Sequence, residues 1–141
     1  MNEAPTRFDT KIAIVIRSDL EPWQKLNVAA FLASGIAGAF PNCIGEPYED
    51  ASGTRYLALI GQPVLIYAGD RPALARALER AITRSVQAAV YTEEMFTTTH
   101  DAANRAAVKA VAKGDLKLVG LAFRADRKVI DKIVDGLKFH D

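Results

Sequence analysis

The hydrophobic residues of this chain fall into short continuous runs separated by longer segments in which apolar and polar residues follow a helical period. Four of the runs predict strands, and the continuous β-branched first run is typical of a central strand that is buried on both faces. The predicted strands are Ile12–Ile16, Pro63–Ala68, 86–94 and 116–124.

The segment after the first run predicts a long helix, Trp23–Phe40, that is apolar nearly all round. Such a helix is expected to be largely covered by the rest of the fold. Pro22 suits its first turn, and either Asp19 or Glu21 is expected to cap it. Gly35 permits another element to approach this helix closely.

Three further helices are predicted, one after each of the other runs. Asp70 is the expected N-cap of the second helix, and Thr99 or Asp101 that of the third. Gly114 is a good C-terminal stop for the third helix. The second helix is expected to start at Asp70, the third to cover about 100–113, and the fourth to cover 125–141.

The segment 42–62 has no regular period and contains the string YEDASGTRY. Asp50, Ser52 and Gly53 are turn-forming residues within that string. The segment therefore predicts a hairpin or an ordered loop between the first helix and the second strand.

Strand and helix alternate along the whole chain, which predicts a three-layer α/β domain. In such folds ligands bind outside the carboxyl ends of parallel strands. The segments 17–25, 69–71 and 91–99 follow three strands and are the expected place of a site. Residues 1–10 are polar and are interpreted as an N-terminal arm, and 11–141 as a single domain.

The composition narrows the classes of function. The chain has 141 residues, half of them apolar, and its 18 basic residues nearly balance 17 acidic ones. A net charge of +1 gives no support for binding to tRNA or to a membrane. Cys43 is the only cysteine, which fits a reducing compartment, and we expect a cytoplasmic protein without a signal peptide or a bilayer-spanning segment.

Several short strings stand in a characteristic order: Arg17-Ser18-Asp19-Leu20, then Lys25, Asn27, Ala29, Ala30 and Phe31, then Gly61-Gln62-Pro63, and finally Ile130-Asp131-Lys132 with Leu137-Lys138. This order resembles the peptidyl-tRNA hydrolase 2 family. It resembles more closely an uncharacterised bacterial family related to those hydrolases, a domain of unknown function typified by structural-genomics structures. The resemblance implies a mixed four-stranded sheet flanked by helices in a three-layer α/β/α arrangement.

The resemblance also implies a site. Lys25, Glu93 and Thr97 stand where the hydrolases keep a lysine, a carboxylate and a threonine, and they are the candidate catalytic residues. The candidate ligand-binding residues around them are Arg17, Asp19, Asn27, Phe31, Ser34, Phe96 and Thr98.

The chain departs from the hydrolases where the chemistry would take place. Phe31 and Ser34 replace a glutamine and a histidine, and Asn27 replaces a second lysine. The glycine of the family's Asp-Ala-Gly-x-Thr string is absent from 93–97, and a helix at about 100–113 replaces a short loop. Ester cleavage needs a positioned water and a stabilised oxyanion, so these changes argue against retained peptidyl-tRNA hydrolysis.

More ordinary interpretations compete with these roles. Lys25 is also compatible with a solvated lysine in the first turn of a helix, and Glu93 with a surface acid. Cys43 is expected to be a buried, inert thiol. The two histidines and the one cysteine lie far apart in the sequence, so no metal site and no cofactor is expected.

The first hypothesis is therefore an altered cleft that binds an unknown small or anionic ligand. The second hypothesis is an active peptidyl-tRNA hydrolase or another esterase. The third hypothesis is a structural or interaction module without catalysis, with a homodimer formed through an apolar helix face. A dry cleft packed by Phe31 and Phe96 would favour this third hypothesis.

Overall fold

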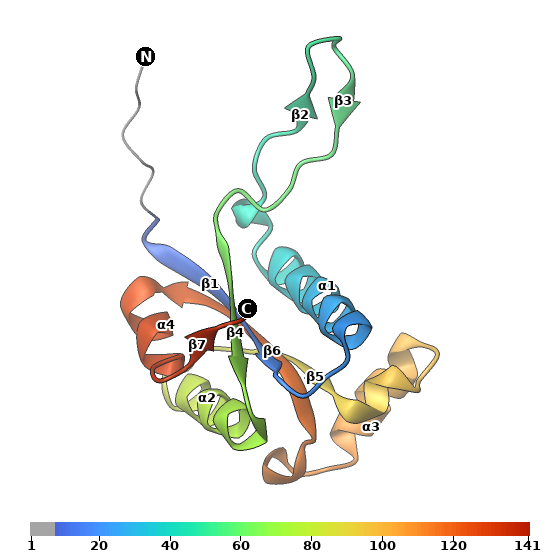
Figure 1. Cartoon of the computed structure of the whole chain (residues 1–141), viewed down its shortest axis with the longest axis vertical. Helices are drawn as coiled ribbons and strands as arrows, with labels where there is room; N and C mark the ends of the chain where they lie inside the picture. Colours follow the sequence, from blue (N-terminus) through green and yellow to red (C-terminus); the bar gives the residue numbers. More distant parts are fainter. Residues whose placement is uncertain (1–7) are drawn as a thin grey trace.

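The structure is a computed structural model that describes residues 8–141, so most of the predicted N-terminal arm lies outside the described residues. Its centre is a five-stranded mixed sheet with the strand order β5-β6-β1-β4-β7 (Figure 1). Strand β1 pairs with β4 in parallel, and the other neighbours in the sheet are antiparallel. The strands are β1 (Thr10–Arg17), β4 (Val64–Gly69), β5 (Ala89–Thr92), β6 (Leu118–Asp126) and β7 (Lys138–Phe139).

The expected number of four strands is wrong because the C-terminal segment returns to the sheet. The last predicted helix, 125–141, ends early, since α4 covers only Arg127–Ile133. Gly136 then adopts a φ of +87°, a left-handed conformation that glycine reaches without strain, and the chain turns back. Phe139 comes to lie opposite Tyr67 of β4 and stacks on its ring, with the centroids 4.9 Å apart.

The four predicted helices are present with changed ends: α1 (Pro22–Ala39), α2 (Arg71–Thr83), α3 (Asp101–Lys109) and α4. Glu21 and Asp70 are confirmed as N-caps, and the Asp70 carboxylate accepts a hydrogen bond from the Ala73 amide. The cap of α3 is His100 rather than Thr99 or Asp101, because its ring nitrogen Nδ1 accepts a hydrogen bond from the Ala103 amide.

Short 3₁₀ turns fill some of the connections. They are η1 (Pro41–Cys43), η2 (Glu93–Phe96) and η3 (Lys113–Asp115). Gly114 lies in η3, several residues beyond Lys109, so it is not the stop of α3. Cys43 in η1 is buried, as expected.

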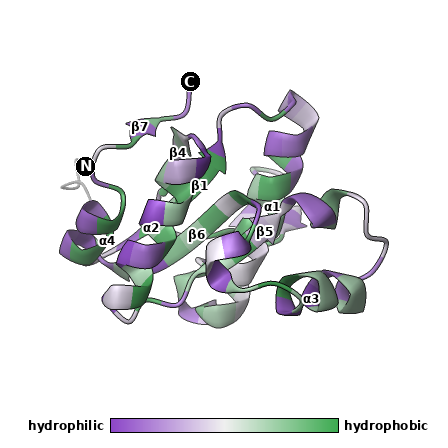
Figure 2. Cartoon of the chain, turned by 90° about the horizontal axis from the view of Figure 1, so that it is seen from below, coloured by the Kyte–Doolittle hydropathy of each residue, from purple (hydrophilic) through white to green (hydrophobic). Residues whose placement is uncertain are grey.

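The alternation of side chains along β1 separates two hydrophobic layers. Ile12, Ile14 and Ile16 point towards α1, whereas Ala13 and Val15 point towards α2 and α4. All five side chains are at most 2 % exposed, so β1 is the central strand that its sequence predicts. Figure 2 shows the hydrophobic strand β6 with α2 on one side and α1 on the other, and hydrophobic clusters lie on both faces of the sheet, which is the layering that the sequence predicts.

Helix α1 packs on the sheet at Gly120 of β6. A Cβ atom at this position would lie only 2.5 Å from Cγ1 of Val28 and 2.8 Å from Cδ1 of Leu32. Val28, Leu32 and Ile36 form the buried stripe of the helix. The flanks of the helix are more open than its composition predicts, because Leu26 is 74 % exposed and Phe31 is 55 % exposed.

Between η1 and β4 the chain forms a hairpin from β2 (Tyr48–Glu49) and β3 (Arg55–Tyr56), which confirms the turn predicted at Asp50–Gly53. The hairpin projects away from the body of the molecule (Figure 1). No helix within residues 8–141 is both long enough and apolar enough to cross a membrane.

Candidate functional site

The carboxyl ends of β1, β4 and β5 meet at one edge of the sheet, as the order of the strands predicts. The Ser18 amide donates a hydrogen bond to the Gly69 carbonyl oxygen, at 2.9 Å. Arg17, at the end of β1, reaches Glu93, which follows β5 directly. Sequence segments that are about 75 residues apart are thereby joined where a site was expected.

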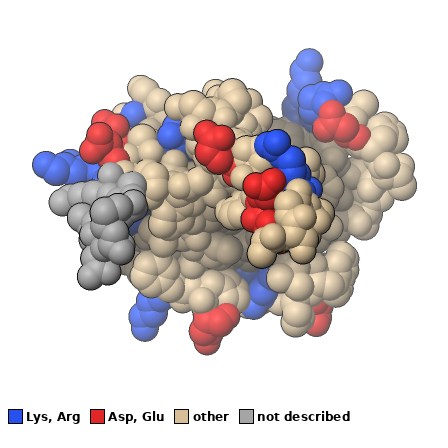
Figure 3. Space-filling view, turned by 90° about the horizontal axis from the view of Figure 1, so that it is seen from above, with Lys and Arg blue, Asp and Glu red and all other residues tan. Residues whose placement is uncertain are grey.

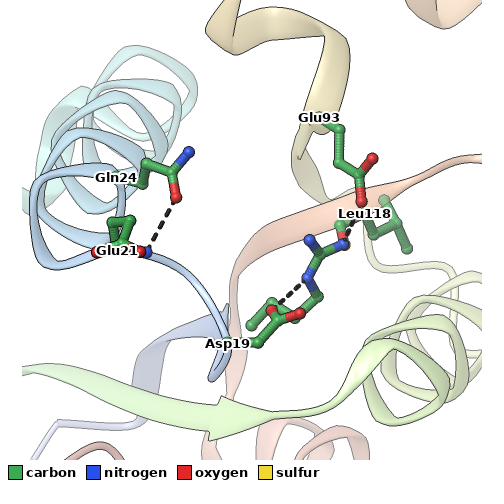
Figure 4. A network of polar contacts seen from close by, with 6 residues as sticks. Asp19, Glu21, Gln24, Glu93 and Leu118 are labelled. Atoms are coloured by element: carbon green, nitrogen blue, oxygen red, sulfur yellow. Dashed lines mark hydrogen bonds and ion pairs between the residues drawn. The ribbon is translucent and has the colours of Figure 1, made fainter.

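Asp19, Glu93 and Leu118 surround one guanidinium group at this edge (Figure 4), and this group belongs to Arg17, the centre of a polar cluster. Its Nε atom donates to Asp19 Oδ1 at 2.7 Å, and its Nη1 atom donates to Glu93 Oε1 at 2.7 Å and to the Leu118 carbonyl oxygen at 3.3 Å. Burial lowers the pKa of the guanidinium group, but the hydrogen bonds to Glu93 and Asp19 outweigh this and raise the pKa above its usual value. The cluster therefore ties the start of η2 to β1 and β6.

Beside this cluster lies a hollow that we call the aromatic groove. It consists of two adjoining cavities of about 350 and 480 Å³ between α1, the end of β5, η2 and α3. Both cavities share the lining residues Phe31, Tyr91, Met95, Asp101 and Asn104.

Four aromatic rings follow one another along the aromatic groove. The Trp23 and Phe96 rings meet edge to face with their centroids 5.8 Å apart, and the Tyr91 ring lies 5.2 Å from that of Phe96. The Phe31 ring lies 5.8 Å from that of Tyr91. These separations are typical of favourable aromatic pairs, so the rings form one connected apolar wall.

A few polar groups interrupt this wall. The Tyr91 hydroxyl lies 3.4 Å from both Asn27 Oδ1 and the Met95 carbonyl oxygen. Burial raises the pKa of Tyr91, so its phenol is neutral near neutral pH. Thr98 donates to the Met95 carbonyl oxygen at 3.2 Å and is also paired with the Asn104 side chain.

Helix α3 adds charge to the aromatic groove. Asp101 and Arg105, four residues apart, form an ion pair, and Lys109 lies one turn further along the same face. Since the first two charges compensate each other, Lys109 leaves this end of the groove with a positive charge. The helix at about 100–113 thus shapes the cleft, as its position in the sequence predicts.

A second hollow of about 440 Å³, the Lys25 hollow, lies on the other flank of α1. Its apolar walls come from α1, β1 and β4, and its polar groups are at Lys25 and the C-terminal residues. The lining residues are Ile16, Pro22, Lys25, Leu26, Ala29, Ile66, His140 and Asp141.

The structure divides the predicted site residues between these places. Asn27, Phe31, Phe96 and Thr98 line the aromatic groove, whereas Lys25 lines the Lys25 hollow. Arg17, Asp19 and Glu93 form the polar cluster.

The remaining two predicted residues bond to their own backbone turns. The Thr97 hydroxyl donates to the Glu94 carbonyl oxygen at 3.0 Å, and the Ser34 hydroxyl donates to that of Phe31 at 2.5 Å. Both side chains are exposed, and neither of them lines the aromatic groove or the Lys25 hollow.

The resemblance did not mark several residues of the aromatic groove. Tyr91 lies at the end of a strand, and Asn104 and Val108 lie on α3. Asp101, Asn104, Arg105 and Val108 follow the i, i+3, i+4, i+7 spacing of one helix face, which is the signal that identifies this lining. Trp23, in the first turn of α1, also lines the groove, with 60 % of its surface exposed.

Across residues 8–141, no three His, Cys, Asp or Glu side chains lie close enough together to hold a metal ion. Acidic and basic side chains are interspersed over the end of the molecule seen in Figure 3, and most of that surface is uncharged. The small net charge is therefore not concentrated into a basic patch on that face.

Comparison with known proteins places the chain among relatives without an assigned activity. The family model described as "Protein of unknown function (DUF2000)" matches residues 10–141. A solved structure of a protein of unknown function from Agrobacterium tumefaciens strain C58 is 48 % identical and superposes with a TM-score of 0.94. The match covers 96 % of this chain and 100 % of that one. A comparison with curated proteins finds no match.

Proposed function

The chain belongs to the DUF2000 family of proteins of unknown function, and from the surface of this member we propose that it binds a small anionic molecule with an aromatic or other planar apolar end. The planar end would lie against the rings of the aromatic groove. The anionic group would lie towards Lys109 on α3.

The strongest support for this proposal is the exposure of two aromatic rings. Trp23 and Phe31 keep 60 % and 55 % of their surface exposed, although both line a hollow that already contains Tyr91 and Phe96. Large rings usually contribute to stability by packing into the core. Rings that instead surround an open cavity of several hundred Å³, with a few polar groups among them, are typical of a ligand site.

The alternative that Phe31 and Phe96 close a dry cleft has less support, because the cavity between them remains open. A binding role is therefore favoured over a purely structural role for this region.

Hydrolysis of peptidyl-tRNA or of another ester is supported less well by the geometry. Glu93 already accepts a charge-assisted hydrogen bond from Arg17, and the Thr97 hydroxyl donates to a carbonyl oxygen of its own turn. Lys25 lies in a different hollow from the other groove residues. The relationship to peptidyl-tRNA hydrolase 2 itself stays a prediction from the sequence strings.

The proposal can be tested with 2-naphthoate, a planar anion, and with 2-naphthalenemethanol, its neutral counterpart. Calorimetric titration of the full chain is expected to show binding of both, with the anion bound more tightly. The variant Phe31→Ala should bind both probes about 3- to 10-fold more weakly, since one stacked ring contributes roughly 0.5–1.5 kcal/mol. Binding of neither probe at millimolar concentration would overturn the proposal.

Two matched variants give the controls. Lys109→Gln should weaken binding of 2-naphthoate about 2- to 5-fold and leave 2-naphthalenemethanol unchanged, as expected for an exposed charge contact. Ile82→Ala truncates a half-exposed apolar residue on α2, which does not line the groove, and should bind both probes as the wild type does. Equal weakening by Phe31→Ala and Ile82→Ala would place the probes outside the groove.

A further inference from the structure

The hairpin between α1 and β4 forms an arm, residues 44–59, whose side chains have little contact with the body of the protein. Residues 44–57 are all exposed, and the arm leaves the molecule next to the C-terminal end of α1 (Figure 1). A two-stranded hairpin of this size is at best marginally stable alone in water. The arm therefore has to be stabilised by its own bonds or by a partner.

Internal hydrogen bonds give the tip of the arm a defined shape. One carboxylate oxygen of Asp50 accepts hydrogen bonds from the Ser52 and Thr54 amides, at 2.9 and 3.0 Å. The other oxygen accepts a hydrogen bond from the Tyr56 hydroxyl at 2.7 Å, and this bond lowers the pKa of Asp50. The tip is thus built as a specific turn rather than as an open loop.

The base of the arm is also fixed. The Gly45 amide donates to the Leu59 carbonyl oxygen at 2.8 Å, and the Gly61 amide donates to the Cys43 carbonyl oxygen at 2.7 Å. The two chains approach so closely here that a Cβ atom on Gly61 would lie 3.2 Å from the Cα atom of Gly45. A rigid base holds the arm away from the body.

The surface of this shaped arm is unusually apolar for a projecting element. Leu57 is 87 % exposed, Leu59 61 %, Tyr48 54 % and Tyr56 52 %. Exposed apolar side chains that gather on one element mark an interaction surface.

The body offers a matching surface beside α1. Within residues 8–141 the helix packs mainly on β1, β5 and β6, and it leaves β4 on the same face of the sheet only partly covered. The Lys25 hollow lies along this partly covered margin, and its walls, including Ile66 and the 74 % exposed Leu26, are apolar.

The dimensions of arm and helix are also compatible. One side of the arm, residues 44–49 before the turn, spans at most about 20 Å at roughly 3.3 Å per extended residue. Helix α1, with its 18 residues, is about 27 Å long at 1.5 Å per residue. An arm from a second molecule that points the opposite way is therefore long enough to reach the first half of the helix, where Pro22, Lys25, Leu26 and Ala29 line the Lys25 hollow.

We propose that the partner is a second copy of this chain, and that each copy lays its arm into the Lys25 hollow of the other. A two-fold axis makes this exchange reciprocal, so both apolar surfaces of both copies are covered by one closed interface. The arm and the lining of the hollow together approach the roughly 20–30 residues per partner found in stable interfaces. The aromatic groove, on the other flank of α1, stays accessible in this dimer.

Sedimentation equilibrium of the full chain tests the exchange. The wild type is expected to be a dimer at about 100 µM. Leu57→Asp in the arm and Leu26→Asp in the hollow should each raise the dissociation constant at least about 30-fold. Both side chains are exposed in the monomer, so the circular dichroism spectra and the melting temperatures should change little. Leu59→Asp provides a second arm variant, and Val111→Asp, an exposed position after α3, should stay dimeric.

Mixing the two variants distinguishes the exchange from other dimers. A heterodimer of Leu57→Asp and Leu26→Asp has one intact pair of arm and hollow, whereas each homodimer has none. An equimolar mixture should therefore associate more tightly than either variant alone. A monomeric wild type at this concentration would overturn the proposal. A Leu26→Asp variant that dimerises as tightly as the wild type would also overturn it, since the arms would then contact each other, and so would a mixture that associates no more tightly than the tighter of the two variants alone.

Discussion

The two flanks of helix α1 differ in what covers them. On one flank, η2 and α3 form the far wall of the aromatic groove, and four rings line the space between. On the other flank β4 is only partly covered within residues 8–141, and Lys25 borders an open apolar hollow. One helix thus separates a surface suited to a small ligand from a surface suited to a second protein chain.

The difference follows from the period of the helix. Trp23, Asn27 and Phe31 repeat every four residues and face the aromatic groove, whereas Pro22, Leu26 and Ala29 face the Lys25 hollow. Neighbours in the sequence, such as Leu26 and Asn27, point to different flanks. The sequence placed the residues at the start of α1 in one cleft, whereas in the structure they line two separate surfaces.

The largest expected effect comes from disrupting the close packing of α1 on Gly120, which positions both flanks of the helix. Gly120→Val places methyl groups where Val28 and Leu32 already lie, and it should lower the free energy of unfolding by about 3 kcal/mol. Thermal and urea unfolding would measure this loss. Gly38→Ala is the matched control, because a Cβ atom there meets nothing within 4 Å, and it should stabilise the helix by about 0.5–1 kcal/mol. Equal stability of Gly120→Val and the wild type would contradict the packing described.

Disrupting the polar cluster around Arg17 is expected to have a smaller effect, which is confined to the flank of α1 that faces the aromatic groove. Arg17→Ala removes the group that ties Glu93 and η2 to β1, and it should cost about 1–3 kcal/mol because the charge-assisted hydrogen bonds of a largely buried guanidinium group are lost. Calorimetry should show weaker binding of 2-naphthoate as well, since Phe96 is part of η2. Glu93→Gln keeps a hydrogen-bond acceptor and should lose less. An Arg17→Ala variant with unchanged affinity would show that η2 holds its position without the cluster.

The arm is expected to respond to pH within its own residues. The hydrogen bond from Tyr56 lowers the pKa of Asp50 below its usual 3.8 and raises the pKa of Tyr56 above its usual 10.0. Because the pKa of Asp50 is lowered, its carboxylate stabilises the turn above about pH 4, and this stabilisation is lost as the pH falls further. Because the pKa of Tyr56 is raised, its hydroxyl stabilises the turn below about pH 10, and this stabilisation is lost as the pH rises further. Backbone NMR shifts of Ser52 and Thr54 should therefore stay constant between these limits. Asp50→Asn should abolish the transition at the acid end, and a transition near neutral pH would contradict the assignment.

The smallest effects are expected at the residues that bond only to their own turns. Thr97→Ala and Ser34→Ala should change the free energy of unfolding by less than about 0.5 kcal/mol, as for ordinary exposed positions. Neither change should alter the affinity for 2-naphthoate. Loss of binding in Thr97→Ala would restore this residue to the site and weaken the separation of roles described above.

The parts of the fold that short-range patterns determine were predictable from the sequence. The β-branched run Ile12–Ile16 is the central strand, and Asp70 caps its helix. The return of the C-terminus was missed, because Gly136 was not recognised as the turn after the helix and the pairing of Phe139 with Tyr67 joins distant parts of the chain. A contact between residues so far apart in the sequence leaves no local signal.

The site was predictable only in part for a related reason. The meeting of Arg17 and Glu93 follows from strand order, and Phe31 and Phe96 line one cavity, while their role in binding stays a prediction. Lys25 was assigned to the same cleft because of a short sequence motif. In the structure Lys25 and Asn27 point to opposite flanks, and this depends on how α1 is rotated about its axis where it packs on Gly120. That rotation is a property of packing, which a linear motif does not encode.

The most direct test of ligand binding is an NMR titration of the full chain with 2-naphthoate. The indole N–H of Trp23, the chain's only tryptophan, and the side-chain amides of Asn27 and Asn104 report on the aromatic groove. The side-chain amide of Gln62, which bonds to the Thr10 carbonyl oxygen, reports on a remote part of the sheet. We predict saturable shifts of the three groove signals with one common dissociation constant and no shift at Gln62. Shifts confined to Ile16, Ile66 and His140 would place the ligand in the Lys25 hollow and contradict the account.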